Sequence, residues 1–355
     1  MVLEKMINKN ALFKSKLYLL NENKSISDAI KKLQISKIKT LIVINKKKKL
    51  IGTVTDGDIR RGILKGYNGS DAVLNIANKR PYKKILGLKN YNKLEKKNIS
   101  VLPVVNKENI LKSLEFFNFN SGFSNFNYNT DILIMAGGFG KRLMPITKKI
   151  PKPLIKIKKK TLLEIIIYNF KKYGFHEFKI STFYKSNLIK KYFKKKKLGI
   201  KIDYIQEKTP LGTAGCLGLL NYKDIKKNII IHNGDIISDL NISNLLKFHK
   251  DSESDITICA KEKINSSPFG QILFKGQKVK KILEKPKNKN FINAGIYVFK
   301  KEVIKNILPK KIDITSLIES KILKGLSVNI YPIYEYWVDI GRRDVLKEIL
   351  KGKND

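Results

Sequence analysis

The chain has 355 residues, 42% of them hydrophobic, and a formal net charge of +43, which allows one large or two moderate domains. A charged N-terminus and the lack of any run of roughly 18 apolar residues argue against a signal peptide and a membrane span, so we expect a cytoplasmic protein without a membrane partner. Cys216 and Cys259 lack the spacing of a metal or disulfide site, and lysines scattered over the whole chain argue against a specific nucleic-acid partner.

The first third of the chain contains an internal repeat, in which residues 39–46 match residues 100–107 at an offset of 61. In each copy, a strand of the buried type ends in a polar turn. Residues 25–33 precede the first strand, open with the N-cap residue Ser25 and have helical spacing of apolar residues. Each copy is therefore predicted to form a helix, a strand, a turn and a second strand.

Residues 52–60, Gly-Thr-Val-Thr-Asp-Gly-Asp-Ile-Arg, lead from a strand into a helix. With the repeat, they resemble a tandem pair of CBS domains, a small α+β module, over residues 1–120. The resemblance implies an adenine nucleotide as ligand, with Thr55 at a phosphate and Asp58 at the ribose hydroxyls. The second copy has no equivalent residues after Val105, so only one ligand site is expected. A packing or dimerising module without a ligand is the alternative.

Residues 121–130 are rich in Asn and poor in charge, and we interpret them as a linker. Beyond them, strands and helices alternate. The predicted strands cover residues 131–136, 179–182, 200–205 and 228–232, and the predicted helices cover residues 162–173 and 240–249. This alternation predicts a doubly wound, Rossmann-like α/β domain over residues 131–355, with ligands at the carboxyl ends of its strands.

A glycine-rich turn with Gly137, Gly138 and Gly140 follows the first strand of this domain. Glycines let the backbone approach a triphosphate and point N–H groups at its oxygens, and Arg142 and Lys152 would add positive charge. The Pro-Lys-Pro around Lys152 fits neither the Walker pattern nor a dinucleotide-binding fingerprint. The turn is therefore expected to bind a nucleoside triphosphate in another way.

Over residues 131–350 the chain resembles the sugar-phosphate nucleotidyltransferases. Further motifs follow in the family's order, namely Leu-Gly-Thr-Ala-Gly from Leu211, Asn-Gly-Asp from Asn233, Glu-Lys-Pro from Glu284, Asn-Ala-Gly-Ile-Tyr from Asn293 and Trp-Val-Asp from Trp337. The resemblance implies a GT-A-like fold. It also implies site residues, which are Gly137, Gly138, Gly140, Glu207 and Gly212 for the nucleotide, Gly270, Glu284 and Asn293 for the sugar, Arg142, Lys152 and Lys285 for catalysis, and Asp235 and Asp339 for the metal. Glu207 or Gln206 would read the edge of the base.

The implied reaction is attack by a sugar 1-phosphate oxygen on the α-phosphorus of a nucleoside triphosphate, with loss of pyrophosphate. Mg²⁺ prefers oxygen ligands, so two carboxylates with phosphate oxygens and waters would hold it. A CBS pair ahead of this domain resembles GDP-sugar pyrophosphorylases. We therefore expect GTP and either glucosamine 1-phosphate or mannose 1-phosphate as substrates, in the synthesis of surface-glycan precursors.

Three alternatives stay open. The first is thymidylyl or uridylyl transfer to glucose 1-phosphate, the second an inactive nucleotide-sensing regulator, and the third a polyanion-binding protein that uses the basic surface. Lys141 keeps the inactive alternative open, because the family more often has Thr or Ser before the arginine. A lysine there replaces a hydroxyl contact with charge or weakens the site. We also expect a homo-oligomer.

Overall fold

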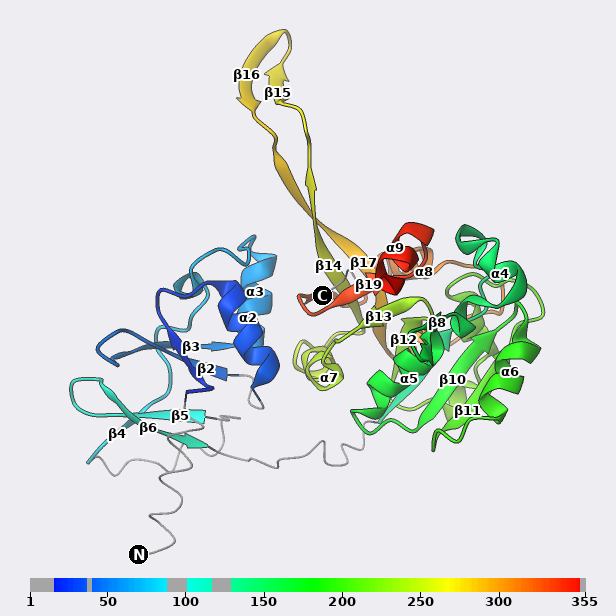
Figure 1. Cartoon of the computed structure of the whole chain (residues 1–355), viewed down its shortest axis with the longest axis horizontal. Coiled ribbons are helices and arrows are strands. Elements are labelled where there is room, and N and C mark those ends of the chain that lie inside the picture. Colours follow the sequence, from blue (N-terminus) through cyan, green and yellow to red (C-terminus); the bar gives the residue numbers. More distant parts are fainter. Residues whose placement is uncertain (1–15, 37–39, 88–100, 117–128, 352–355) are drawn as a thin grey trace, which may run out of the picture. The chain divides into compact units, whose positions relative to one another are not determined.

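The computed structural model of the chain describes residues 16–36, 40–87, 101–116 and 129–351. The chain forms two compact units, Met1–Gly122 and Phe123–Asp355 (Figure 1). Most of the expected linker, residues 121–130, lies outside the described residues, and Thr130 already belongs to a strand. Within the described ranges, no helix has the length and apolar character needed to cross a bilayer.

The N-terminal unit contains two copies of one strand arrangement, in which the middle strand pairs parallel to the first and antiparallel to the third. The copies are β1 (Leu19–Asn21), β2 (Thr40–Ile44) and β3 (Leu50–Thr55), then β4 (Lys84–Ile85), β5 (Val101–Val105) and β6 (Leu111–Phe116). Both antiparallel ladders have a β-bulge at the same step, after Val43 and after Val104. These positions are 61 residues apart, which confirms the repeated strand, turn and strand. The helix predicted before the second copy falls in residues 88–100, outside the described residues.

Two helices accompany the first copy, α2 (Ile26–Ile35) and α3 (Asp56–Leu64), and α2 confirms the helix predicted after Ser25. Both helices begin with a capping box, in which an N-cap hydroxyl and an aspartate three residues later satisfy each other's backbone N–H groups. The two copies share one cluster of buried apolar side chains, formed by Tyr18, Ile42, Leu50, Val101, Val105 and Leu114.

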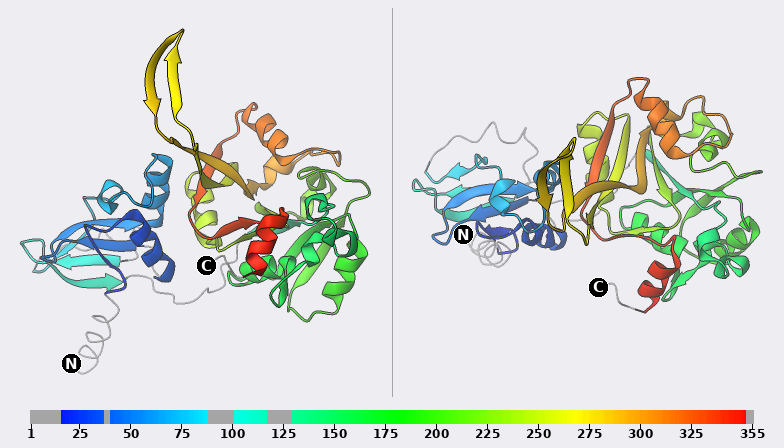
Figure 2. Two further views of the ribbon diagram at one scale, coloured as in Figure 1. Left: turned by 45° about the horizontal axis from the view of Figure 1, so that its top comes forward. Right: turned by 90° about the horizontal axis from the view of Figure 1, so that it is seen from above.

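The C-terminal unit is built on one mixed seven-stranded sheet (Figures 1 and 2). The strand order is β11 (Lys201–Gln206), β10 (Glu177–Thr182), β7 (Thr130–Met135), β12 (Asn228–Asn233), β17 (Lys287–Lys300), β14 (Ile256–Ser266) and β18 (Val328–Ile333). The first four strands are parallel to one another, and β17 is antiparallel to its neighbours. This arrangement confirms the predicted α/β class.

Helices lie on both faces of this sheet. Successive side chains of β7 point to opposite faces, so that Ile132 and Ile134 belong to one core and Leu133 to the other. The first core includes side chains of α5 (Leu162–Lys171), α6 (Ser186–Lys194) and α7 (Ile242–Asp251), and the second includes side chains of α8 (Ile314–Ile322). Burial on both faces explains the continuous apolar run of β7.

Two features extend this sheet at the edge where β7 and β12 end. Strand β13 (Ile236–Ser238) follows β12 and pairs with β19 (Trp337–Asp339), after which α9 (Arg343–Leu350) begins. Strands β14 and β17 continue beyond the sheet as a stem that ends in the hairpin of β15 (Gln271–Lys275) and β16 (Lys278–Leu283), and we call residues 262–291 the arm. Figures 1 and 2 show the arm extending away from the sheet.

Candidate active site

The glycine-rich turn lies directly after β7, at the carboxyl end of the parallel strands, where doubly wound sheets bind ligands. Two backbone hydrogen bonds fix it to its surroundings. Ala136 N donates to Ser181 O at 2.9 Å, and Tyr184 N donates to Gly137 O at 3.3 Å. The turn is therefore anchored to β10 and to the loop that follows β10.

The three glycines of this turn have different surroundings. Gly140 has a φ of 65°, and a Cβ added there would lie 2.7 Å from Thr147 Cγ2. The hydroxyl of Thr147 donates to Gly140 O at 2.9 Å. A Cβ added at Gly137 would lie 2.7 Å from Glu207 Oε1, whereas one added at Gly138 would have no neighbour within 4 Å. The fold itself therefore requires Gly137 and Gly140, and the space beside Gly138 is open to a ligand.

Asp235 and Asp339, which we call the carboxylate pair, lie together at the end of β12. Asp235 follows that strand by two residues, and the pairing of β13 with β19 sets Ile236 opposite Asp339. Ile340 N donates to Asp235 O at 2.9 Å. Lys152, which begins the short helix η3, forms an ion pair with Asp235. The structure thus brings together three of the predicted site residues from distant parts of the sequence.

Charged groups surround Asp339, and Arg142 is the weakest of those that act on it. Burial raises the pKa of Asp339 above its ordinary value, and the nearby Asp235 raises it further. Lys152, the N–H of Gly341 and Arg142 lower it, and that N–H donates to Asp339 Oδ1 at 2.7 Å. Two carboxylates that repel each other in this way are the arrangement that a bound cation relieves.

The carboxylate pair fits a magnesium ion. Magnesium is usually held by one or two protein carboxylates together with substrate phosphates and waters. In the parts of the chain that the structure describes, no larger cluster of His, Cys, Asp and Glu side chains could hold a metal. The side-chain oxygen of Asn233, two residues before Asp235, is buried without a hydrogen-bond partner. A metal here would therefore take much of its ligand shell from the substrates.

Glu207 does not have a free carboxylate with which to read a base. Its side chain is buried, and it accepts hydrogen bonds from the hydroxyl of Ser181 and from Leu211 N, the latter at 3.0 Å. It also lies against the glycine-rich turn. Glu207 therefore joins this turn, β10 and its own loop. Gln206, the other side chain expected to read the base, is exposed, but it accepts from Lys190 at 3.0 Å and donates to Thr182 O at 3.3 Å.

The glycines of the Leu-Gly-Thr-Ala-Gly loop pack against a neighbouring segment of backbone. Gly212 has a φ of 74°, and a Cβ added there would lie 2.7 Å from Ile312 O. A Cβ added at Gly215 would lie 2.1 Å from Lys310 O. Close packing of the chain on itself already requires these glycines. Contact between Gly212 and the nucleotide stays a prediction.

The predicted sugar-site residues are divided between the sheet edge and the arm. Asn293 lies at the edge, where its side-chain oxygen accepts from Gly295 N at 3.0 Å. Gly270 and Glu284 face each other on the arm, since a Cβ added to the glycine would lie 3.3 Å from Glu284 Oε2. Lys285 is exposed beside them. The structure does not bring these three arm residues to the carboxylate pair, because the ladder of β14 and β17 carries them away from the sheet (Figure 1).

Thr55 and Asp58 lie together at the start of α3. The hydroxyl of Thr55 donates to Asp58 Oδ2 at 2.7 Å, and Asp58 N donates to Thr55 Oγ1 at 3.2 Å. Arg61 forms an ion pair with the same aspartate. Ser25 and Asp28 make an identical capping box at α2. Helix capping thus accounts for both side chains, and their contact with an adenine nucleotide stays a prediction.

Lys141 begins the short helix η2, directly before Arg142. Its ammonium lies 5.8 Å from the centre of the Phe139 ring, within the range of a cation–π contact. The same ring lies 5.4 Å from that of Tyr184. Lys141 therefore lies at the rim of the glycine-rich turn, and its effect on phosphate binding stays a prediction.

The sequence analysis missed Ser181 and the amide of Asn233. Ser181 is a polar residue in a buried strand, and such residues need a buried partner, here Glu207. Asn233 belongs to the Asn-Gly-Asp motif, of which only the carboxylate had been considered. Cys216 lies close to Glu207, and burial together with that negative charge raises the pKa of the thiol to about 12. This cysteine is therefore protonated at neutral pH.

Residues 132–354 match the nucleotidyl transferase family, and residues 11–65 match the CBS domain. The chain is 33% identical over 229 residues to mannose-1-phosphate guanylyltransferase catalytic subunit beta of Dictyostelium discoideum, and the match covers 62% of either chain. It is 34% identical over 212 residues to D-glycero-alpha-D-manno-heptose 1-phosphate guanylyltransferase of Campylobacter jejuni, with 59% of this chain and 93% of that protein covered. This chain therefore spans less than two thirds of the Dictyostelium relative.

Solved structures resemble the C-terminal unit. The crystal structure of HddC from Yersinia pseudotuberculosis superposes with a TM-score of 0.50 at 26% identity, and the match covers 63% of this chain and 99% of HddC. HddC in complex with GMP-PN superposes with the same TM-score at 25% identity, again over 63% of this chain and 99% of HddC.

Proposed function

Because the chain belongs to the nucleotidyl transferase family, which its residues 132–354 match, we propose that it transfers a guanylyl group from GTP to a sugar 1-phosphate. An oxygen of the sugar phosphate forms a bond to the α-phosphorus of GTP. The bond from that phosphorus to the oxygen bridging to the β-phosphate breaks, and pyrophosphate leaves with the electron pair. The products are a GDP-sugar and pyrophosphate, and no covalent enzyme intermediate is needed.

The carboxylate pair beside Lys152 and Arg142 is the observation that supports this proposal. Asp235 and Asp339 would hold Mg²⁺, which supplies positive charge where two anions must meet. Arg142 and Lys152 both lower the pKa of Asp339, Lys152 also pairs with Asp235, and the two cations would stabilise the triphosphate and the departing pyrophosphate. The chain's own contribution is thus positioning and electrostatic stabilisation at a fixed sheet edge.

The relatives support GTP and a sugar of the manno configuration. The Dictyostelium relative is named for mannose 1-phosphate and the Campylobacter relative for a manno-heptose 1-phosphate, and both are guanylyltransferases. Of the two sugars expected from the sequence, mannose is therefore favoured over glucosamine. Thymidylyl and uridylyl transfer have no comparable support.

Pyrophosphate release from the purified full chain tests this function. GTP, dTTP and UTP are each combined with mannose, manno-heptose, glucosamine and glucose 1-phosphates in the presence of Mg²⁺. We expect release with GTP and a manno-configured substrate only, and no release from Asp235→Asn. Asp251→Asn, at the exposed end of α7, is the matched control and should behave as the wild type. Equal release of pyrophosphate with GTP, dTTP and UTP, or no release with any pair of substrates, would contradict the proposal.

We further propose that the N-terminal unit binds an adenine nucleotide, which its match to the CBS domain supports. The start of α3 is the candidate site, with Thr55 and Asp58 in the roles that the resemblance implies and the exposed Arg61 beside them. We assign the whole protein to the cytoplasm, as expected from the sequence.

A further inference from the structure

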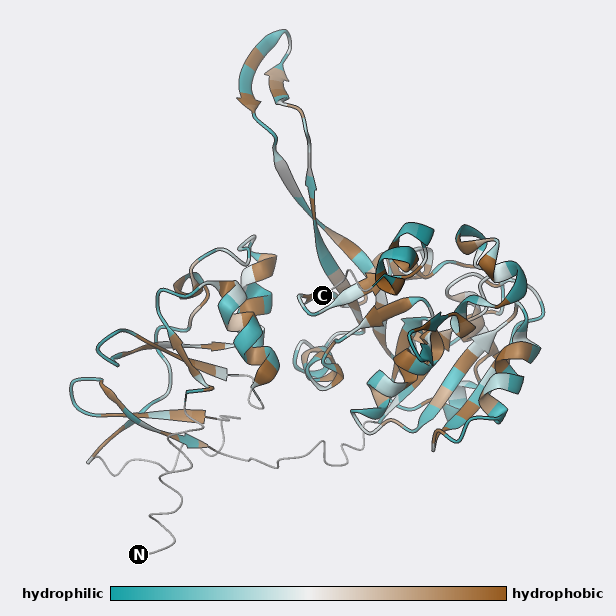
Figure 3. Ribbon diagram, in the orientation of Figure 1, coloured by the Kyte–Doolittle hydropathy of each residue, from teal (hydrophilic) through white to brown (hydrophobic). Residues whose placement is uncertain are grey.

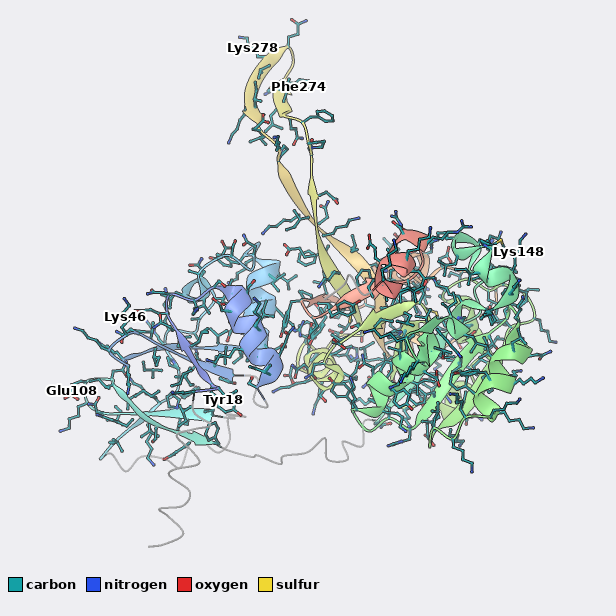
Figure 4. All side chains as sticks on the ribbon, viewed as in Figure 1. Tyr18, Lys46, Glu108, Lys148, Phe274 and Lys278 are labelled. Carbon is teal, nitrogen blue, oxygen red and sulfur yellow. The ribbon has the colours of Figure 1, made fainter. Side chains whose placement is uncertain are left out.

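The hairpin at the end of the arm has one apolar face. Side chains of β15 and β16 alternate between two faces, and the pairs Ile272–Ile282 and Phe274–Val279 place four apolar side chains on one of them. In that order, they are 53%, 64%, 71% and 58% exposed. Figure 3 shows hydrophobic positions along this hairpin, and Phe274 projects from it in Figure 4. We call these four side chains the apolar face.

The hairpin has no support from the rest of its own chain. Every residue of β15 and all but the last residue of β16 are exposed, so no other described part of the chain covers either strand. A sheet of only two strands is marginally stable in water, and packing of its apolar side chains against another surface stabilises it. The hairpin therefore needs a surface that covers its apolar face.

The stem of the arm keeps the body of the same chain from covering this face. Its ladder runs without a register shift over residues 261–266 and 287–292. At 3.3 Å per residue, the paired strands span roughly 20 Å. An ion pair between Lys289 and Glu262, at 3.8 Å, also joins them. Folding the hairpin back would break hydrogen bonds of this ladder, so the covering surface belongs to another molecule.

The distribution of charge on the hairpin indicates what kind of molecule fits the apolar face. That face contains no ionisable side chain. Three lysines lie on the opposite face, in the pairs Lys275–Lys278 and Leu273–Lys281. An anionic partner, such as a nucleic acid or lipid headgroups, would be attracted to the lysines and leave the apolar face uncovered. The surface that covers the apolar face is therefore itself uncharged and apolar.

We propose that two copies of this chain pair through their arms, with the two apolar faces packed against each other. A second arm offers the same uncharged face with the same area, and a two-fold axis makes the contact self-complementary. With the arms antiparallel, Phe274 and Val279 near the tip of one hairpin pack against Ile272 and Ile282 of the other. The two faces then form a small core that covers both hairpins. This pairing does not depend on the proposed function.

The lysines on the opposite face do not prevent this contact. Sheets that pack face to face lie about 10 Å apart, and these lysines point outward from the pair, so the ammonium groups of the two arms are separated by roughly 20 Å. That distance exceeds the Debye length of about 8 Å at physiological ionic strength, so salt screens their repulsion. Added salt should therefore strengthen the pairing, whereas it weakens the binding of polyanions.

The area of the apolar face predicts a weak pair. With roughly 150–200 Å² for a fully exposed side chain of this size, the four side chains expose on the order of 400 Å² per arm. Two faces with their polar rims would bury on the order of 1,000 Å² in total, which is the lower limit for a specific interface. Interfaces of this size dissociate on dilution, so we expect the pair to form at micromolar concentrations of protein.

Hydrogen–deuterium exchange of the full chain, over a series of protein concentrations, tests the pairing. Amides of β15 and β16 should exchange about fivefold more slowly or less at high than at low micromolar protein, because the covered hairpin opens less often. Phe274→Asp places a charge on the apolar face and should remove this dependence on concentration. Leu273→Asp, on the opposite face of the same strand, is the matched control and should keep it.

Three results would overturn the pairing of arms. The first is an arm whose amides exchange at the same rate at every concentration, or whose protection survives in Phe274→Asp. The second is an equal, concentration-dependent protection of a segment outside the arm, which would place the arm on the body of the second copy. The third is protection that appears only with phosphatidylglycerol vesicles or RNA and is lost in added salt, because that dependence is typical of a polyanion.

Discussion

The carboxylate pair and the arm leave the same edge of the same sheet but are held in place differently. Asp235 and Asp339 are fixed by the pairing of β13 with β19 and by the ion pair to Lys152. The arm is held by its own two-stranded ladder, with its apolar side chains in water. Residues within a packed frame have one position, whereas the position of residues on a projecting hairpin depends on what packs against the hairpin.

Both regions carry an unfavourable feature that binding would relieve. At the sheet edge, two carboxylates repel each other, and a cation with its phosphates would offset that repulsion. On the arm, apolar area is exposed, and a protein surface would cover it. The first feature concerns chemistry and the second concerns assembly, so substitutions should separate the two.

The largest effect is expected from removing charge. Asp235→Asn should lower kcat by at least about 10²-fold, because it removes a metal ligand at the reacting phosphate. Lys285→Ala should instead raise KM for the sugar phosphate by about 10- to 100-fold and leave KM for GTP unchanged. Steady-state pyrophosphate release measures both, with Lys250→Ala at the end of α7 as a neutral control. Equal losses of kcat in both variants would show that the carboxylate pair and the arm do not have different roles in catalysis.

Substitutions in the glycine-rich turn should separate effects on folding from effects on GTP binding. Gly140→Ala should destabilise the C-terminal unit by about 1–3 kcal/mol, because the new Cβ meets Thr147 and φ is positive. Gly138→Ala has open space and should leave the melting temperature unchanged while weakening GTP binding. Thermal unfolding and GTP titration of the two variants test this difference. If Gly138→Ala binds GTP normally, the nucleotide does not lie beside that residue.

At Asp339 we expect a smaller change in stability, and this change is an increase rather than a loss. The pKa of Asp339 is raised in the folded protein, so the ionised carboxylate destabilises the fold above that pKa. This destabilisation disappears below the pKa of the unfolded chain, near 3.8, where the carboxyl group is protonated in both states. Asp339→Asn should therefore raise the melting temperature of the metal-free protein by a few degrees at pH 7 and not at pH 3.5, while abolishing turnover. A lower melting temperature at pH 7 would show that the carboxylate stabilises the fold.

The smallest effects are expected in the N-terminal unit, which lies outside both regions. Thr55→Ala and Ser25→Ala each remove one helix cap and should each cost about 1 kcal/mol. Calorimetric titration with AMP should lose its heat in Thr55→Ala alone if the start of α3 is the ligand site. The same heat in both variants would leave Thr55 with a capping role only.

The sequence predicted the parts of the fold whose signals are local. The α/β class, the strands before the glycine-rich turn and before Asp235, and the repeat in the N-terminal unit followed from apolar runs and their spacing. The packing contacts of Glu207 with β10 and of Gly212 with Ile312 could not be predicted, because they join segments far apart in the sequence and no local pattern reveals them. The position of Lys285 was missed for a different reason, since its motif does not encode how far β14 and β17 stay paired beyond the sheet.

The two cysteines have a practical consequence. Both are buried, and the thiol of Cys216 has a pKa of about 12, so almost none of it is thiolate at neutral pH. Because the chain contains no others, a cysteine introduced at the exposed Gln277, between β15 and β16, would be the preferred target of a fluorophore or spin label in the native protein. The end of the arm could then be followed by spectroscopy in an otherwise unaltered chain.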